Sequence, residues 1–156
     1  MINIYSDEYF MRMALREAQE ALLQGEIPIG AILVDPQNKV IAKGRNQVEL
    51  LNDPTAHAEM LCLSAGFEYL NAKYLNQCTI YVTLEPCPMC AGALFWSQIG
   101  KIVYGATDKK RGLLHPYIER QESIPYLHPK TIVVAGVLEN ECGRLLTDFF
   151  KSKRQS

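Results

Sequence analysis

Two short stretches of this 156-residue chain carry side chains that can bind a metal ion and move protons. His57 and Glu59 lie two positions apart, and Cys87 and Cys90 lie three apart in Pro-Cys-Pro-Met-Cys. A catalytic zinc ion takes three protein ligands and leaves its fourth position for water. We therefore expect His57, Cys87 and Cys90 to hold one Zn2+ per chain. Glu59 stays off the metal in this interpretation and acts as the catalytic acid and base.

The combination of the two motifs is more specific than either motif alone. His-x-Glu by itself is typical of a solvated helix face, and Cys-x-x-Cys also occurs as a redox pair or as two small core residues. The Trp-Cys-Gly-Pro-Cys context of a redox pair is absent here. His-x-Glu followed by Pro-Cys-x-x-Cys is the signature of zinc-dependent base deaminases. In that chemistry the glutamate takes a proton from water and returns it to a ring nitrogen and to the leaving amine.

Helix starts must position these side chains. Cysteines in a first helical turn meet unpaired N–H groups and the positive end of the helix dipole, and both favour the thiolate. Residues two positions apart lie about 200° apart on a regular helix. His57 and Glu59 can therefore serve one zinc ion only near a helix start. We expect Asp53 or Thr55 to cap that helix.

The hydrophobic pattern predicts an alternation of strands and helices. Strands are expected at 29–35, 40–44, 79–83, 101–105 and 131–135. Helices are expected at 7–24, 55–70, 86–97 and 140–153, with 45–54 and 108–130 as irregular segments. This order predicts an α/β fold with helices on both faces of a sheet. The length is that of one domain, spanning 1–156.

Composition excludes several classes of protein. Hydrophobic residues make up 48% of the chain and charged residues 21%, which excludes a disordered or collagen-like chain. The net charge of -1 gives no global basic field, so nucleic-acid binding would need a local patch. No apolar run approaches the ~18 residues of a membrane helix. Met1–Phe10 lacks the order of a signal peptide, so we expect a cytoplasmic protein without membrane association.

The remaining cysteines and histidines suggest no second site. We interpret Cys62, Cys78 and Cys142 as small buried hydrophobic residues, the usual role of free cysteine. His115 and His128 each precede a proline in the irregular segment, and we interpret them as loop or surface histidines rather than ligands.

Matches to a known family extend over nearly the whole chain. They lie at Glu26–Val34, Asn46, Asn52–Glu59, Thr79–Ala93, Ile99–Gly105 and Glu141–Phe150. In these stretches the chain resembles the bacterial tRNA-specific adenosine deaminases. The zinc motifs are shared by the whole cytidine/deoxycytidylate deaminase superfamily. The C-terminal Glu-Cys-x-x-Leu-Leu-x-Asp-Phe-Phe pattern resembles the tRNA branch specifically.

The resemblance implies a three-layer α/β/α sandwich around a five-stranded mixed sheet, cytidine deaminase-like, and a homodimer with the site near its interface. It implies hydrolysis of adenosine to inosine at the wobble position of tRNA, with the anticodon stem-loop as partner and no protein partner besides the second copy. Asn46 would contact the nucleoside, and the backbone of Ala58 would hydrogen-bond the base. Ile27 and Leu84 would form apolar walls, and Phe149 would lie near the anticodon loop.

Two alternatives stay open from the sequence. A guanine or other free-base or nucleoside deaminase shares the zinc motifs, and Asn52-Asp-Pro-Thr55 suits the guanine branch. The C-terminal helix ending in Phe149-Phe150, with its basic tail, favours RNA instead. A zinc-stabilised scaffold that binds RNA without turnover would need a fourth Cys or His near the pair, which the sequence lacks.

One stretch departs from the family pattern. Lys109–His115 replaces a run of small residues, and its basic side chains either contact phosphate or form a solvated loop.

Overall fold

The computed structural model describes residues 4–155. The first three residues of Met1–Phe10, the stretch in which we expect no signal peptide, lie outside the described part. A five-stranded sheet with the order β2-β1-β3-β4-β5 forms the centre. Its strands are β1 (Gly30–Val34), β2 (Val40–Arg45), β3 (Thr79–Leu84), β4 (Lys101–Ala106) and β5 (Ile132–Val134). β1 is antiparallel to β2 and β3, whereas β3, β4 and β5 are parallel. The predicted mixed sheet is therefore confirmed.

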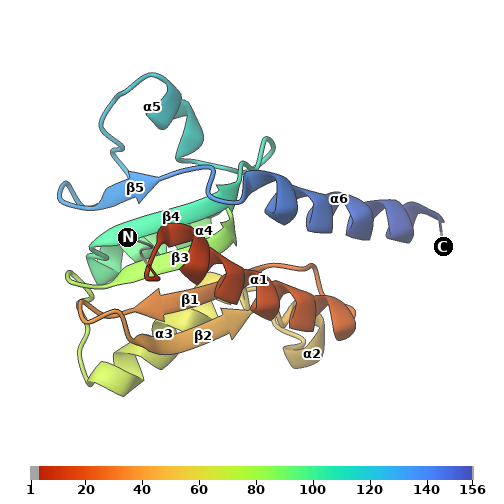
Figure 1. Cartoon of the computed structure of the whole chain (residues 1–156), viewed down its shortest axis with the longest axis horizontal. Coiled ribbons are helices and arrows are strands. Elements are labelled where there is room, and N and C mark those ends of the chain that lie inside the picture. The colour runs from red at the N-terminus through yellow and green to blue at the C-terminus, as the bar shows by residue number, and fades with distance from the viewer. Residues whose placement is uncertain (1–3, 156) are drawn as a thin grey trace.

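Helices cover both faces of this sheet (Figure 1). α1 (Asp7–Leu23) and α6 (Glu139–Gln155) lie on one face, while α3 (Ala58–Leu70) and α4 (Pro88–Ser97) lie on the other. Two short helices, α2 (Val48–Leu51) and α5 (His115–Glu119), stand in segments that the sequence pattern assigns to loops. The predicted three-layer α/β/α architecture is confirmed, and the two short helices are additions to it.

Apolar side chains explain the layers. Ile32 and Val34 of β1 face α1, whereas Leu33 faces α3, because successive side chains of a strand point to opposite faces. α3 approaches β2 closely at Gly44, where a Cβ atom would overlap the carbonyl oxygen of Ala58. This contact brings the first turn of α3 onto the sheet, so the position of residues 57–59 is set by packing.

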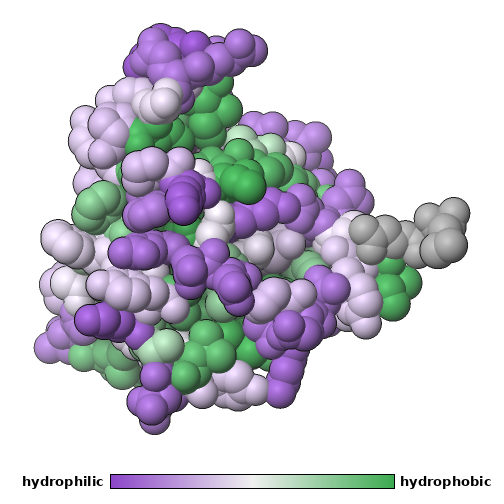
Figure 2. Space-filling model, turned by 90° about the vertical axis from the view of Figure 1, so that its left-hand side faces the viewer, coloured by the Kyte–Doolittle hydropathy of each residue, from purple (hydrophilic) through white to green (hydrophobic). Residues whose placement is uncertain are grey.

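The strand directions gather several connections at one edge of the sheet. β2, β3, β4 and β5 run the same way, so the segments that follow them leave at the same edge, where the segment preceding β1 also arrives (Figure 1). The opposite edge faces the viewer in Figure 2, which shows hydrophilic and hydrophobic side chains intermingled. Among residues 4–155, every helix is too short or too polar to span a lipid bilayer.

Candidate active site

Three metal-binding side chains meet at the edge where β2 and β3 end. The Nδ1 atom of His57 lies 3.6 Å from the Sγ atom of Cys87 and 3.6 Å from the Sγ atom of Cys90. A tetrahedral zinc ion, with bonds of about 2.0–2.1 Å to nitrogen and about 2.3 Å to sulfur, places these atoms about 3.6 Å apart. The donor set and its spacing therefore fit zinc without rearrangement.

Two helix starts position these donors. His57 is the N-cap of α3, with extended backbone angles, and Cys87 is the N-cap of α4, followed by Pro88 at the first helical position. Because His57 precedes the helix, its ring and the side chain of Glu59 can face the same group although they lie two positions apart. The prediction that Asp53 or Thr55 caps α3 is wrong. The Asp53 carboxylate accepts the N–H and the hydroxyl of Thr55, so it caps its own turn.

The two thiols share one proton in the metal-free protein. A hydrogen bond from the Cys90 thiol lowers the pKa of Cys87 to about 5, and the His57 ring contributes to this shift. The same hydrogen bond, together with burial, raises the pKa of Cys90. Metal binding displaces this proton because a ligating cysteine must be deprotonated. The pair is therefore prepared to become two thiolate ligands.

Glu59 lies beside the three donors and is 4% exposed. Burial raises the pKa of Glu59 to about 7. A hydrogen bond from the backbone N–H of Glu59 lowers this pKa, and the negative charge of the Cys87 thiolate raises it. The Glu59 side chain also hydrogen-bonds the Cys90 thiol. In the metal-free protein this buried carboxyl group therefore binds a proton more readily than a solvated glutamate does. Its place beside the three donors suits a residue that takes a proton from water.

The other predicted contact residues lie around the same edge. Asn46 follows β2 and is buried, its N–H donating to the carbonyl of Ile29 at 3.1 Å. Ala58 is the first residue of α3, between His57 and Glu59. Ile27 is exposed in the segment before β1, and Leu84 is half-buried at the end of β3. The sheet thus brings these four positions to the edge that carries the metal donors, and their roles stay predictions.

Phe149 belongs to the opposite layer. It is 9% exposed in α6, with its ring 5.3 Å from the Phe150 ring and 5.5 Å below the Lys153 ammonium group. α6 begins near the end of β4 and runs away from the sheet (Figure 1). The predicted proximity of Phe149 to RNA stays a prediction.

The cysteines outside the metal site match the predictions, whereas one histidine differs from them. Cys62, Cys78 and Cys142 are buried free thiols, as predicted. His115 has a structural role beyond that of a loop histidine. It begins α5, its Nδ1 lies 2.8 Å from the Tyr104 hydroxyl, and its Nε2 pairs with Glu119 at 3.0 Å.

Two buried carboxylates near the site are absent from the sequence-based predictions. Glu26 accepts the N–H groups of Glu49 and Leu50 at 3.0 and 2.7 Å, and thereby holds the start of α2. Glu85 accepts the N–H groups of three residues in the segment after β4. The sequence marks these glutamates only by their positions. Glu26 lies next to Ile27, and Glu85 lies two residues before Cys87.

Comparisons with known proteins agree with this geometry. Residues 4–106 match the model of the cytidine and deoxycytidylate deaminase zinc-binding region. The class of the chain is thus a zinc-binding deaminase. A tRNA-specific adenosine deaminase of Aquifex aeolicus is 45% identical over 149 residues, which cover 96% of this chain and 97% of that protein. The chain therefore belongs to the tRNA-specific adenosine deaminase branch of this family.

Solved structures also resemble this chain more closely when they are tRNA deaminases than when they are guanine deaminases. A structure from a study of A-to-I editing by tRNA:A34 deaminases is 40% identical, with a TM-score of 0.80, and the match covers 88% of this chain and 99% of that one. A guanine deaminase from Bacillus subtilis is 38% identical, with a TM-score of 0.62, but covers 65% of each chain. The likeness to the tRNA deaminase extends over more of the molecule than the likeness to the guanine deaminase.

Proposed function

We propose that this chain hydrolyses adenosine to inosine at the wobble position of tRNA. The observation that carries the proposal is the three-donor group of His57, Cys87 and Cys90, spaced for zinc, with the buried carboxyl group of Glu59 beside it. Three protein ligands leave one position open, which is the arrangement of a catalytic rather than a structural zinc site.

Zinc binding and proton transfer are assigned to different residues. His57, Cys87 and Cys90 hold the zinc ion, which supplies Lewis acidity that lowers the pKa of water. Glu59 accepts a proton from the attacking water and delivers it to a ring nitrogen. It then accepts the second proton, from the hydroxyl group that the attack leaves on the ring carbon, and delivers it to the departing amine. Adenosine and water thus give inosine and ammonia.

Side chains around the sheet edge orient the substrate. The Asn46 side chain and the Ala58 backbone bind the nucleoside. Ile27 and Leu84 form apolar walls around the base, consistent with their place at the same edge as the metal donors.

An RNA loop is the substrate that the C-terminal helix favours. A target base must leave its stack to enter a deaminase pocket, and anticodon loops present bases that are already unstacked. Phe150 is 43% exposed near the end of α6, and Lys151, Lys153 and Arg154 follow it on exposed positions. Aromatic faces stack on bases at about 1–3 kcal/mol per base, and lysine and arginine neutralise phosphates. We propose that this end of α6 contacts the anticodon stem-loop.

The test compares substrates and chain lengths. Because Phe149 is buried, the chain should be cut after Phe149 so that the core stays filled. The full chain should form inosine in an anticodon stem-loop with adenosine at the wobble position, and the shortened chain much less. Neither should act efficiently on guanine or free adenosine. Efficient guanine deamination without inosine in the RNA would assign the chain to the guanine branch instead.

We also propose that two copies associate through the outer face of α4. Trp96 is 76% exposed there, and a nearby apolar hollow of about 400 Å³ is lined by residues including Phe95, Leu113 and Tyr126. Exposed aromatic groups of this size are typical of protein interfaces. Light scattering should give the mass of a dimer, and Trp96→Glu should give the mass of one chain. A wild-type monomer at micromolar concentration would contradict this proposal.

A further inference from the structure

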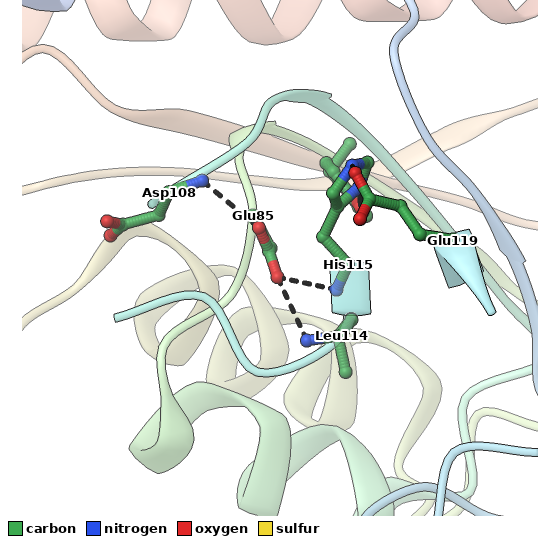
Figure 3. A network of polar contacts seen from close by, with 6 residues as sticks. Glu85, Asp108, Leu114, His115 and Glu119 are labelled. Atoms are coloured by element: carbon green, nitrogen blue, oxygen red, sulfur yellow. Dashed lines mark hydrogen bonds and ion pairs between the residues drawn. The ribbon is translucent and has the colours of Figure 1, made fainter. Parts of the chain in front are cut away.

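One carboxylate holds the loop that follows β4, residues 108–115, against the site edge. Glu85 is 2% exposed and accepts the N–H groups of Asp108 at 3.0 Å, Leu114 at 2.9 Å and His115 at 2.8 Å (Figure 3). Hydrogen bonds to a charged acceptor are roughly twice as strong as neutral ones. Both ends of the 108–115 loop are therefore fixed to the same side chain.

The loop is shaped to approach this carboxylate. A Cβ atom at Gly112 would overlap the carboxylate oxygens of Glu85, so only glycine allows the observed contact. The N–H of Gly112 donates to the carbonyl of Asp108 at 2.8 Å, which closes the loop on itself. Gly112 therefore offers a second way to disturb the contact without changing Glu85.

The far end of the loop has an additional anchor. In the neutral ring, His115 donates from Nε2 to Glu119 and accepts the Tyr104 hydroxyl at Nδ1. Tyr104 is fully buried in β4, and Figure 3 shows the His115 and Glu119 side chains on the side of Glu85 opposite Asp108. The loop thus returns to the strand from which it started.

The anchored loop presents three consecutive cations. Lys109, Lys110 and Arg111 are exposed, and the Asp108 carboxylate accepts the N–H groups of Lys110 and Arg111 at 3.1 Å each. Lys109 also lines a groove of about 560 Å³ together with Arg144 of α6. That groove carries Glu139 and Asp148 as well, so the excess of positive charge lies on residues 109–111.

The position of these cations relative to the site follows from the sheet. Leu84 and Ala106 are paired across β3 and β4, and the Glu85 N–H donates to the Ala106 carbonyl at 2.9 Å. Cys87 lies two residues beyond Glu85, and Lys109 comes directly after the anchored Asp108. When a base enters a deaminase pocket, the phosphates of its flanking nucleotides stay outside the pocket.

On the basis of the proposed RNA substrate, we propose that Glu85 is a positioning residue that holds Lys109, Lys110 and Arg111 at the rim, where they bind backbone phosphates of that RNA. A chain with a net charge of -1 needs such a local patch, because its overall field does not attract RNA. The preformed loop also reduces the entropy that would be lost if the cations were ordered only on binding.

The first test removes the charges. Lys109→Gln, Lys110→Gln and Arg111→Gln combined in the zinc-loaded full chain should raise KM for the anticodon stem-loop about tenfold, with kcat changed less than about twofold. The slope of log(kcat/KM) against log[salt] should become shallower by about 2, since each neutralised phosphate of a single strand contributes about 0.7. A wild-type KM and salt slope in this variant would overturn the proposal.

The matched control removes equal charge from the opposite edge. Lys39, Lys73 and Lys130 are exposed in the connections that precede β2, β3 and β5. Their combined replacement by glutamine should leave KM and the salt slope within about twofold of wild type. An effect equal to that of the 109–111 variant would show that net charge alone matters, and would also overturn the proposal.

The second test asks whether Glu85 acts through these cations. Glu85→Gln should raise KM severalfold while the protein keeps its zinc, and adding the 109–111 substitutions should then have little further effect. Gly112→Ala should give the same result with Glu85 and Cys87 unchanged, so it decides the question if Glu85→Gln fails to fold. Additive effects would show that Glu85 does not position the cations. Absence of inosine with the wild-type chain would instead contradict the proposed function.

Discussion

The start of α3 and the end of β3 each place a buried glutamate beside the metal donors, and the two carboxyl groups meet opposite surroundings. Glu85 accepts three backbone N–H groups from the 108–115 loop. Glu59 faces the sulfur atoms of Cys87 and Cys90, and burial raises its pKa to about 7. Burial alone therefore does not determine what a glutamate does. Glu85 uses its three N–H partners to hold a loop, whereas Glu59, whose pKa is raised mainly by burial, is placed to exchange protons beside the two cysteines.

Removing the metal should have the largest effect, because it eliminates the group that Glu59 serves and leaves the Glu85 contacts intact. Cys87→Ser, or treatment with a strong chelator, should abolish deamination, while the wild-type chain carries about one zinc per chain. Elemental analysis after desalting and an inosine assay measure both quantities. Full activity without metal, or about two zinc ions per chain, would show that the site is wrongly assigned.

Glu59→Gln should have the next largest effect and separates the two glutamates directly. It removes the proton carrier, so kcat should fall by about 10²–10⁴ while the zinc content stays unchanged. Glu85→Gln should instead leave kcat within about tenfold. Parallel measurement of kcat and zinc content checks both variants. Loss of zinc from Glu59→Gln would identify Glu59 as a ligand and remove the basis of the comparison.

The two substitutions should also change stability in opposite directions. In the metal-free protein, the folded pKa of Glu59 is about 7 against an ordinary value of 4.5. Deprotonation therefore destabilises the fold increasingly between pH 4.5 and 7, by about 3 kcal/mol at most, at about 1.4 kcal/mol per pKa unit. Glu59→Gln should raise the free energy of unfolding at pH 8 and leave it unchanged at pH 4.5.

Glu85→Gln should lower the free energy of unfolding by about 1–3 kcal/mol at pH 8, because its amide group faces an N–H donor that loses its acceptor. Urea unfolding of the chelated proteins at both pH values measures these differences. Equal signs for the two variants would contradict the distinction between an anchoring and a proton-exchanging carboxylate.

The same distinction explains what the sequence could reveal. His57, Cys87 and Cys90 were predictable because zinc chemistry requires particular residue types at short spacing, and the strands were predictable because burial imposes a period of two. Glu85 gave no such signal. Its partners lie 23 to 30 residues further along the chain, and only the pairing of β3 with β4 brings them together.

The two unpredicted helices have a related cause. The first N–H groups of α2 and α5 are accepted by Glu26 and Glu85, which are remote in sequence, instead of by a neighbouring N-cap side chain. Helices of four or five residues are unstable alone, so their formation depends on these distant carboxylates. The late start of α3 has a local cause, the turn at Asp53, which competes with capping.

Glu26→Gln should give the smallest effect of the series. Glu26 is as buried as Glu85, but it accepts two N–H groups rather than three. Both of its contacts are partly buried, whereas the contact of Glu85 with Leu114 is fully buried. Water can therefore replace part of what is lost, so the free energy of unfolding should fall by about 0.5–1.5 kcal/mol. Because Glu26 ties the segment that carries Ile27 to the start of α2, KM for the stem-loop should rise about two- to threefold with kcat unchanged. Urea unfolding and steady-state kinetics, with Glu85→Gln measured alongside, check the order. A larger loss of stability for Glu26→Gln than for Glu85→Gln would show that the number and burial of the N–H partners do not determine how strongly these carboxylates anchor the edge.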